Sequence, residues 1–310
     1  MINKKEDDLA DRIIAEKMIQ AFKSKGRLPK NINVATASGR FWVECHDVKT
    51  DGLMADQSTT GFSTCPEIAL MKALSERAEH QAFIEGHKNG LKSCMTERSD
   101  GFAAYPKCYE DAGFKAREAA LSEATERYVW STWWDNDQIG FKINSIRFES
   151  MNDELIKYSH YIMAECQIAE IFVIRPKIQN HLDRTVLILI AHLKSGGFIS
   201  GGACGSDVND VLLRSMDELY RHGLAILKVK EKKISAVSFY EQRLVFFGLG
   251  HGSKIVSKRL AAEGNESIVL PSLLIDEAIE HSMSDDYVVH RCLFENQPAF
   301  IGGKMERLCL

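Results

Sequence analysis

Charged side chains recur at one fixed spacing in three segments whose composition favours helices. The pairs are Glu76 and Glu79, Glu123 and Glu126, and Glu218 and Arg221. Because residues i and i+3 lie on one face of an α-helix, the two side chains of each pair project from the same side. We therefore expect five carboxylates from three helices to converge. Carboxylate clusters of this kind bind Mg²⁺, usually together with the phosphates of a substrate.

Apolar residues beside the first two pairs indicate that the carboxylates border a buried face. The stripes are Ala69, Ala73 and Leu74 before Glu76, and Ala116, Ala120 and Leu121 before Glu123. Burying an unpaired carboxylate costs several kcal/mol unless a metal ion or a basic group compensates it. Three copies in one register favour a binding site. The structural alternative is a duplicated repeat in which the glutamates cap helices or pair locally.

A glycine-containing segment precedes each pair, at 58–63, 99–104 and 200–205. We interpret these segments as turns. Glycine in a turn supplies positive φ. The functional interpretation is a cradle of backbone amides for phosphate, with helix N-termini directed at the anion.

Composition excludes several classes of function. The chain has 310 residues and a net charge of −4, so no overall positive field favours nucleic acid. Eight cysteines are scattered without a CxxC pair, which indicates the reduced thiols of a cytoplasmic protein. The N-terminus is too charged for a signal peptide. The apolar run 186–191 is too short to span a membrane and predicts a buried strand.

Hydrophobic periodicity predicts an α+β fold in which the three repeat helices pack on mixed, largely antiparallel sheets. Besides the repeat helices, helices are expected at 6–24, 153–164, 253–262 and 271–281. Strands are expected at 40–48, 139–149, 166–175, 185–194, 242–248 and 287–293, with a loop at 86–98 and the strands at 166–175 and 185–194 forming a hairpin. We expect residues 1–30 to form an N-terminal helical segment and 31–310 to form one intertwined domain. Trp130, Trp133 and Trp134 could stack on adenine, but aromatic residues at this spacing are more typical of a core.

The three motifs together resemble those of the YcaO family, enzymes that modify peptide backbones with ATP. The segment Lys72-Ala73-Leu74-Ser75-Glu76-Arg77-Ala78-Glu79-His80 is similar to the first family motif. Ser99-Asp100-Gly101-Phe102-Ala103, with 116–127, is similar to the second. Ser200 to Gly205, with Arg214 to Arg221, is similar to the third, and 287–291 resembles the last strand of the family. The resemblance covers about residues 40–295.

The resemblance implies an ATP- and Mg²⁺-dependent enzyme that phosphorylates a backbone amide oxygen of a ribosomally made precursor peptide. A neighbouring Cys, Ser or Thr then closes an azoline ring, or sulfide gives a thioamide. By this resemblance, 31–310 are expected to be an ATP-binding domain, and the magnesium ligands are expected to be Glu76, Glu79, Glu123, Glu126 and Glu218. Nucleotide-binding positions are these five with Lys72, Ser99, Arg127 and Arg221. A separate E1-like or TfuA-like partner would present the peptide, and a homodimer is compatible with the resemblance.

Three positions depart from the family motifs. Lys72 replaces a serine, His80 an arginine and Arg221 a glutamine. A cation can substitute for part of a divalent charge. We therefore expect fewer Mg²⁺ ions than in the family, with Lys72 or Arg221 contacting phosphate or a site glutamate. The same departures motivate an alternative, a non-catalytic YcaO-like scaffold in a peptide-modifying complex. A third hypothesis is an acyltransferase or another enzyme that uses the glutamates differently.

Overall fold

The computed structural model describes residues 4–46, 58–89, 99–145, 153–179, 183–232, 239–300 and 304–308. Its helices are α1 (Lys4–Ser24), α2 (Pro66–Lys88), α3 (Ala112–Asp135), α4 (Asp153–Glu165), α5 (Val208–Lys232), α6 (Phe239–Gly248) and α7 (Ser253–Leu260). The first strands are β1 (Ile32–Ala37), β2 (Arg40–His46), β3 (Ser58–Ser63), β4 (Gly101–Pro106), β5 (Phe141–Ser145) and β6 (Ile168–Pro176). The others are β7 (Ile178–Gln179), β8 (Thr185–Leu193), β9 (Phe198–Gly205), β10 (Ile268–Val269), β11 (Leu273–Ile279) and β12 (Tyr287–Phe294).

The chain forms two compact units, each assembled from several segments. Unit 1 comprises 1–92, 102–120 and 276–291, and unit 2 comprises 93–101, 121–275 and 292–310. The expected fold class, α+β with largely antiparallel sheets, is confirmed: strands β1 to β3 and the sheet of β5, β6, β8 and β9 pair antiparallel, and the short β7–β10 pair is parallel. A further sheet has the order β11-β12-β4. The boundary expected at residue 30 stays a prediction.

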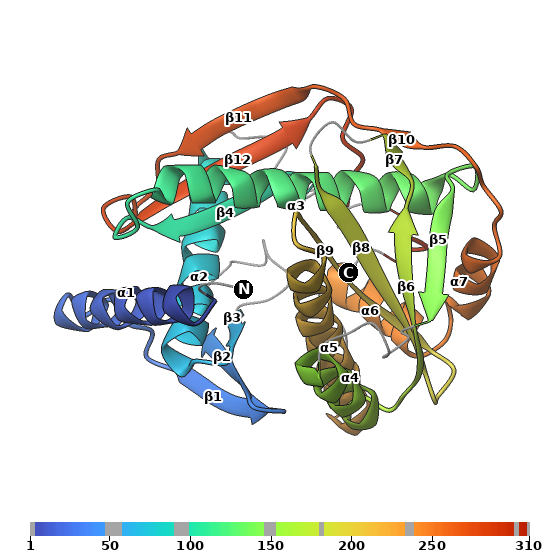
Figure 1. Cartoon of the computed structure of the whole chain (residues 1–310), viewed down its shortest axis with the longest axis horizontal. Coiled ribbons are helices and arrows are strands. Elements are labelled where there is room, and N and C mark those ends of the chain that lie inside the picture. The colour runs from blue at the N-terminus through green and yellow to red at the C-terminus, as the bar shows by residue number, and fades with distance from the viewer. Residues whose placement is uncertain are drawn as a thin grey trace. The chain divides into compact units, whose positions relative to one another are not determined.

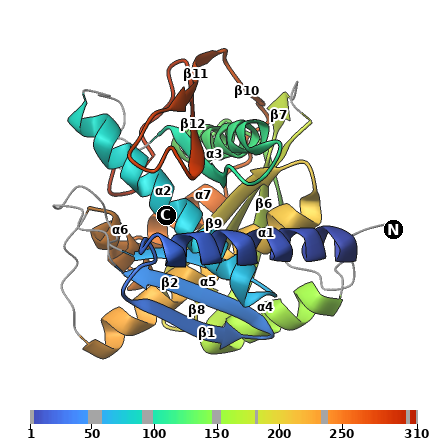
Figure 2. The same cartoon turned by 90° about the vertical axis from the view of Figure 1, so that its left-hand side faces the viewer.

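Unit 1 contains an antiparallel sheet of order β1-β2-β3, on which α2 packs. Helix α1 packs on α2 (Figure 2). The backbone of α2 lies very close to the sheet at Gly61. A Cβ atom added there would lie 2.0 Å from the carbonyl oxygen of Ala69 and 2.8 Å from the amide nitrogen of Ala73. Glycine is therefore required on β3 because the backbone of the helix occupies the place of a side chain.

Substituting Gly61 with alanine is expected to lower the free energy of unfolding by about 3 kcal/mol or more, because backbone atoms cannot move aside as a flexible side chain would. Urea titration measures the change. Gly113→Ala is the matched control, because a Cβ atom at Gly113 would meet nothing within 4 Å. An equal stability of both variants would contradict the packing described here.

Unit 2 contains an antiparallel sheet of order β5-β6-β8-β9 (Figure 1). Its inner strand β8 is buried along nearly its whole length, which explains the uninterrupted apolar run in the sequence.

Adjacent glycines on β9 face two different helices. A Cβ atom at Gly201 would lie 2.5 Å from the Ser215 carbonyl oxygen of α5, and one at Gly202 would lie 2.4 Å from the Trp130 ring of α3. The sheet is thus covered by α5 on one face and by the C-terminal half of α3 on the other.

The interpretation of the glycine segments as turns is wrong. They form β3, most of β4 and the end of β9, each followed by its helix. Positive φ among the described glycines occurs at Gly26, Gly39, Gly196 and Gly250, which lie outside these strands. The glycines of β3 and β9 are therefore needed for close helix packing, and the expected turn-based amide cradle is replaced by a strand–helix unit.

For two segments, the predicted type of secondary structure is wrong. The segment 242–248, expected as a strand, belongs to helix α6, in which Arg243, Leu244 and Phe247 are buried at helical spacing. A short apolar run does not distinguish the two elements. The segment 271–281, expected as a helix, contains strand β11, because pairing with β12 outweighs the helix propensity of its Glu and Ala residues. Strand β1 was missed.

The other expected elements are confirmed within one to four residues where the structure describes them, including the antiparallel pairing of β6 with β8. Helix α2 continues to Lys88, into the segment expected as a loop, and 90–98 lie outside the described residues. The ends of the strands expected at 40–48 and 139–149 also lie outside them. None of the helices in the described ranges is long and apolar enough to cross a bilayer.

Candidate functional site

In unit 1, the first glutamate pair lies on α2, and both carboxylates accept hydrogen bonds from strands. The Glu76 Oε2 atom accepts one from the Thr60 amide at 2.5 Å and one from its hydroxyl at 3.3 Å. The Glu79 Oε1 atom accepts one from the Ala104 amide at 2.9 Å. The His80 Nε2 atom lies 4.0 Å from Glu76 Oε1. Backbone amides and a histidine therefore fix this pair while leaving 25% of the Glu76 side chain exposed.

In unit 2, the glutamates of α3 and α5 meet beside β9. The Glu218 Oε2 atom accepts a hydrogen bond of 2.6 Å from the Gly202 amide, and Arg221 Nη2 lies 3.6 Å from Glu218 Oε1. Glu126 lies against the same glycine, because its Oε1 atom is 3.3 Å from the place of a Cβ atom at Gly202. Glu123 pairs with Arg127. The second and third repeats thus bring three carboxylates together.

Burial and neighbouring charges perturb the carboxyl groups of Glu126 and Glu218. The pKa of Glu126 is raised well above its ordinary value, first by burial and then by the charges of Glu218 and Glu123. Burial raises the pKa of Glu218 to about 7, although Arg221 and the Gly202 amide lower it. Like charges held in one place favour a bound cation that would neutralise them. The protein without a cation therefore holds this group in an electrostatically unfavourable arrangement.

The first and third repeats use the same contact. In each, a glutamate of the helix accepts a hydrogen bond from a strand amide sixteen residues earlier, Thr60 for Glu76 and Gly202 for Glu218. Strand, glycine and glutamate therefore form one repeated structural unit. The duplication alternative explains the equal spacing, but it does not explain why burial and the charges of Glu218 and Glu123 combine to raise the pKa of Glu126.

Three further positions expected in the site have defined contacts. Lys72 is exposed and its Nζ atom donates to the Phe62 carbonyl at 3.0 Å in unit 1. Ser99 is 2% exposed, and its carbonyl accepts a hydrogen bond from Gln297. Arg127 also donates to the carbonyl of Asp100. Arg221 contacts a site glutamate, and Lys72 contacts the backbone of β3.

Two arginines near the acids of unit 2 were missed from the sequence. The charge of Arg214 lowers the pKa of Glu126, and its Nη2 atom donates to the Cys204 carbonyl at 2.8 Å. Arg184 contacts the Ser122 hydroxyl and hydrogen-bonds to Cys204. Arg214 is the first residue of the helical part of the third motif. Its place in that motif could have indicated that it lies near the site. Arg184 precedes the buried strand β8 and carries no such signal.

The five carboxylates are divided between the units. Glu76 and Glu79 belong to unit 1, and Glu123, Glu126 and Glu218 belong to unit 2. Convergence is therefore established within unit 2, and the sharing of one cavity by all five stays a prediction. The tryptophans of α3 are core residues: Trp130 and Trp133 are fully buried and Trp134 is 7% exposed.

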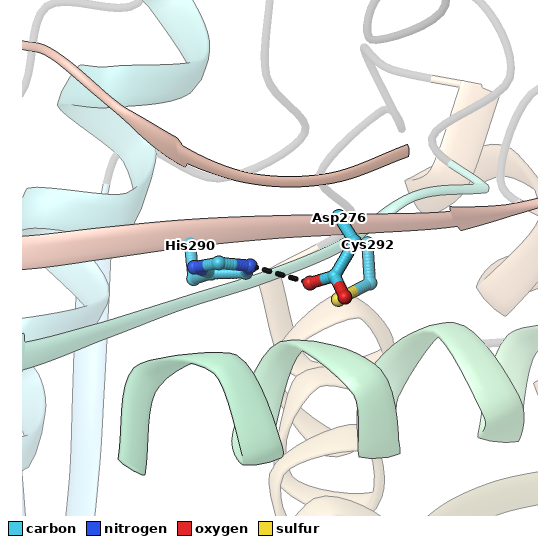
Figure 3. A group of neighbouring side chains, drawn as sticks. All are labelled: Asp276, His290 and Cys292. Atoms are coloured by element: carbon cyan, nitrogen blue, oxygen red, sulfur yellow. Dashed lines mark hydrogen bonds and ion pairs between the residues drawn. The ribbon is translucent and has the colours of Figure 1, made fainter. Parts of the chain in front are cut away.

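A separate group of potential ligand atoms lies on β11 and β12. Asp276, His290 and Cys292 each offer one atom, all within 4.8 Å of one another (Figure 3). Hydrogen bonds from Arg117 and His290 lower the pKa of Asp276. The Arg117 Nη2 atom lies 2.6 Å from Asp276 Oδ2, and His290 Nε2 lies 2.8 Å from Oδ1. Both carboxylate oxygens are already bound by cationic or imidazole donors, so we assign this group to strand pairing.

Comparison with known proteins shows similarity of fold. No family model matches the sequence, and none of the curated proteins matches it. The structure is similar to YcaO from Methanopyrus kandleri bound with AMPPCP and Mg²⁺, with a TM-score of 0.59, 12% identity, and coverage of 96% of this chain and 93% of that chain. It is also similar to a chain of the E. coli microcin synthetase McbBCD complex with pro-MccB17 bound, with a TM-score of 0.57, 9% identity, and coverage of 86% and 88%. A second McbBCD structure gives a TM-score of 0.53 at 10% identity.

Proposed function

We propose that this chain, which has the YcaO fold, uses ATP and Mg²⁺ to activate a backbone amide of a ribosomally made precursor peptide. The observation that carries the proposal is the group formed by Glu123, Glu126 and Glu218 beside Gly202, in which desolvation of Glu126 and Glu218 and repulsion between the carboxylates favour a bound cation. Two similar folds support it, one bound with AMPPCP and Mg²⁺ and one in a synthetase complex with pro-MccB17.

The residues of the site fit Mg²⁺ and a nucleotide. Carboxylate oxygens are the protein ligands that Mg²⁺ prefers, and Mg²⁺ keeps several waters and takes phosphate oxygens besides one or two carboxylates. An open arrangement matches this preference. Among the described residues, Asp276, His290 and Cys292 offer ligand atoms that all lie within 4.8 Å of one another, and the three glutamates of unit 2 do not form a group that tight. Glu76, Glu79, Glu123, Glu126 and Glu218 would hold the metal ions.

The role of the chain is charge neutralisation and positioning. ATP supplies the phosphoryl group that makes an amide oxygen a good leaving group. Arg127 contacts both Glu123 and the Asp100 carbonyl, so it fixes one carboxylate against the start of the second motif. The Gly202 amide fixes Glu218, and Arg221 adds a positive charge beside it. We infer that Arg221 replaces part of one divalent charge, so that fewer Mg²⁺ ions bind than in YcaO relatives.

Product analysis tests the proposed function. The protein is incubated with ATP, Mg²⁺, a precursor peptide and an E1-like or TfuA-like partner, and the peptide is analysed by mass spectrometry. We expect ATP-dependent loss of one water for an azoline, or exchange of oxygen for sulfur for a thioamide. ATP consumption without either change in the peptide would favour an enzyme of another class.

The alternative is a non-catalytic scaffold. It is favoured by the contacts that partly neutralise the acids from within the chain, Arg127 with Glu123 and Arg221 with Glu218. A scaffold would support peptide modification by its complex and show no nucleotide binding of its own. In that case, the peptide would still be modified when Glu126 is replaced by glutamine.

A further inference from the structure

Side chains of α5 cover the free edge of β9. Strand β9 lies at the end of the sheet order β5-β6-β8-β9, so one side of its backbone has no partner strand in the described part of the chain. Arg214 Nη2 donates to the Cys204 carbonyl at 2.8 Å, and Glu218 Oε2 accepts from the Gly202 amide at 2.6 Å. Alternate residues of a strand direct their backbone groups to the same edge. Side chains one helical turn apart therefore take the place of a neighbouring strand.

His222 continues this series by one further turn and reaches the next alternate residue of β9. It is 1% exposed, and its burial lowers its pKa to about 3, so the ring is neutral. Its Nδ1 atom lies 2.6 Å from the Ser200 carbonyl oxygen, and its Nε2 atom is hydrogen-bonded to the Tyr240 hydroxyl of α6. Because a carbonyl oxygen only accepts, Nδ1 carries the proton and Nε2 accepts from Tyr240. We call Arg214, Glu218 and His222 the α5 ladder.

Unit 1 contains the first two contacts of the same arrangement. Lys72 donates to the Phe62 carbonyl across 10 residues of sequence, as Arg214 does in unit 2. Glu76 accepts from the Thr60 amide across 16 residues, which is also the separation in unit 2. A histidine follows the glutamate by one turn in both helices. The ladder is therefore a property of the repeated strand–helix unit.

The contact of His222 with the strand matters because the two residues after Ser200 are glycines. Gly201 and Gly202 carry no side chain that could anchor this part of β9, and glycine has the greatest backbone freedom. The Ser200 carbonyl belongs to the peptide group directly before the one whose amide binds Glu218. Holding this carbonyl therefore limits the movement of the Gly202 amide, which in turn orients the Glu218 carboxylate.

We propose that His222 is a positioning residue for the carboxylate group of unit 2: held by Tyr240, it fixes the part of β9 whose amide orients Glu218. The inference rests on the proposed function only in that the oriented carboxylate serves to bind Mg²⁺ with a nucleotide. The competing account is a buried histidine whose hydrogen bonds contribute to stability alone. On that account, loss of either hydrogen bond of the ring has the same consequences.

Two substitutions separate the two hydrogen bonds of the ring. His222→Asn places an amide nitrogen near the position of Nδ1, so it can still donate to Ser200. His222→Gln places its amide near the position of Nε2, so it can still bind Tyr240 but leaves the Ser200 carbonyl without its donor. Because each variant loses one hydrogen bond, we expect urea titration to show similar decreases of the unfolding midpoint.

The Gly202 amide reports positioning without any ligand. Full-length protein labelled with ¹³C at glycine carbonyls and ¹⁵N at glycine amides gives carbonyl–nitrogen correlations only for the Gly-Gly pairs, 196–197, 201–202 and 302–303. The Gly202 signal is the one that changes in Glu218→Gln. We expect its amide proton to keep the parent position in His222→Asn. In His222→Gln it should shift upfield and exchange faster with solvent, because its hydrogen bond to the carboxylate is weakened.

Calorimetric titration with ATP in the presence of Mg²⁺ measures the consequence for the proposed site. We expect His222→Asn to bind within about twofold of the parent and His222→Gln to bind about tenfold more weakly, because small displacements of a binding group are costly. His251→Gln, at an exposed histidine of unit 2, is the matched control and should bind as the parent does.

Failure of the proposed function and failure of the positioning role give different results. A parent protein that binds no nucleotide would overturn the proposed function, while the Gly202 signals would still decide the role of His222. The role is overturned if the Gly202 amide of His222→Gln matches that of the parent, or if both His222 variants weaken nucleotide binding equally. If His222→Gln does not fold, Tyr240→Phe replaces it, because Tyr240 is half-buried and its hydroxyl holds the ring. A displaced Gly202 amide in that variant supports the role, and a parent-like one overturns it.

Discussion

Replacing Glu126 with glutamine is expected to abolish substrate-dependent ATP turnover, with a loss of about 100-fold or more. Glu126 lies against Gly202, between the charges of Glu218 and Glu123, and a metal ion in this group would need its negative charge. Glutamine has nearly the same shape and keeps one oxygen acceptor, but it carries no charge. The fold should therefore survive, because the substitution removes repulsion instead of packing.

Turnover is measured as phosphate released in the presence of peptide and partner, and folding is measured by urea titration. Glu118→Gln is the matched control on the same helix, since Glu118 pairs with Arg117. Its turnover should equal that of the parent. Parent-like turnover in Glu126→Gln would remove Glu126 from the metal site. An unfolded Glu126 variant would contradict the electrostatic account, because the carboxylate would then be stabilising.

In the absence of divalent metal, the contribution of Glu218 to the stability of the protein is expected to fall as pH rises from about 4.5. The pKa of Glu218 is raised from 4.5 to about 7, so the folded state favours the protonated carboxyl group. The stabilisation by protonated Glu218 is complete below the pKa that this glutamate has in the unfolded chain, and it is lost as pH rises through about 7. A shift of this size corresponds to roughly 3 kcal/mol. The raised pKa of Glu126 acts in the same direction.

The difference between the parent and Glu218→Gln isolates this effect, because other groups titrate in the same range. Burial lowers the pKa of His222 to about 3, which stabilises the protein as pH rises through the ordinary histidine range. Glutamine at 218 can still accept the hydrogen bond from the Gly202 amide. We expect the parent to lose stability relative to Glu218→Gln between pH 4.5 and 7 in chelator, and Mg²⁺ with ATP to reverse the loss. Parallel pH profiles for the two proteins would show that Glu218 is not destabilised in the folded state.

Much of the carboxylate arrangement follows from local rules. The i, i+3 spacing placed Glu123 and Glu126 on one helical face, and the alanines before them indicated the buried side of that face. The uninterrupted apolar run 186–191 predicted the buried strand β8. These features depend on helix and strand periodicity within a few residues, so the sequence contains them in readable form.

Contacts that depend on tertiary structure could not be predicted in the same way. The glycines of β3 and β9 were assigned to turns because glycine is typical of turns, whereas Gly61 and Gly201 are needed where a helix backbone meets a strand. Strand β11 carries helix-forming residues and becomes a strand through its pairing with β12. Arg184 reaches the site from the start of β8, and no spacing in the sequence links it to Glu126.

Calorimetric titration of the parent protein with ATP in the presence of Mg²⁺ tests most directly whether the repeated glutamates form a nucleotide site. We predict binding that requires both ATP and Mg²⁺ and that is lost in Glu126→Gln and Glu76→Gln but kept in Glu118→Gln. Binding in Glu76→Gln tests the carboxylates of unit 1, and binding in Glu126→Gln tests those of unit 2. Absence of binding by the parent, even with peptide and partner present, would contradict the assignment and favour the scaffold.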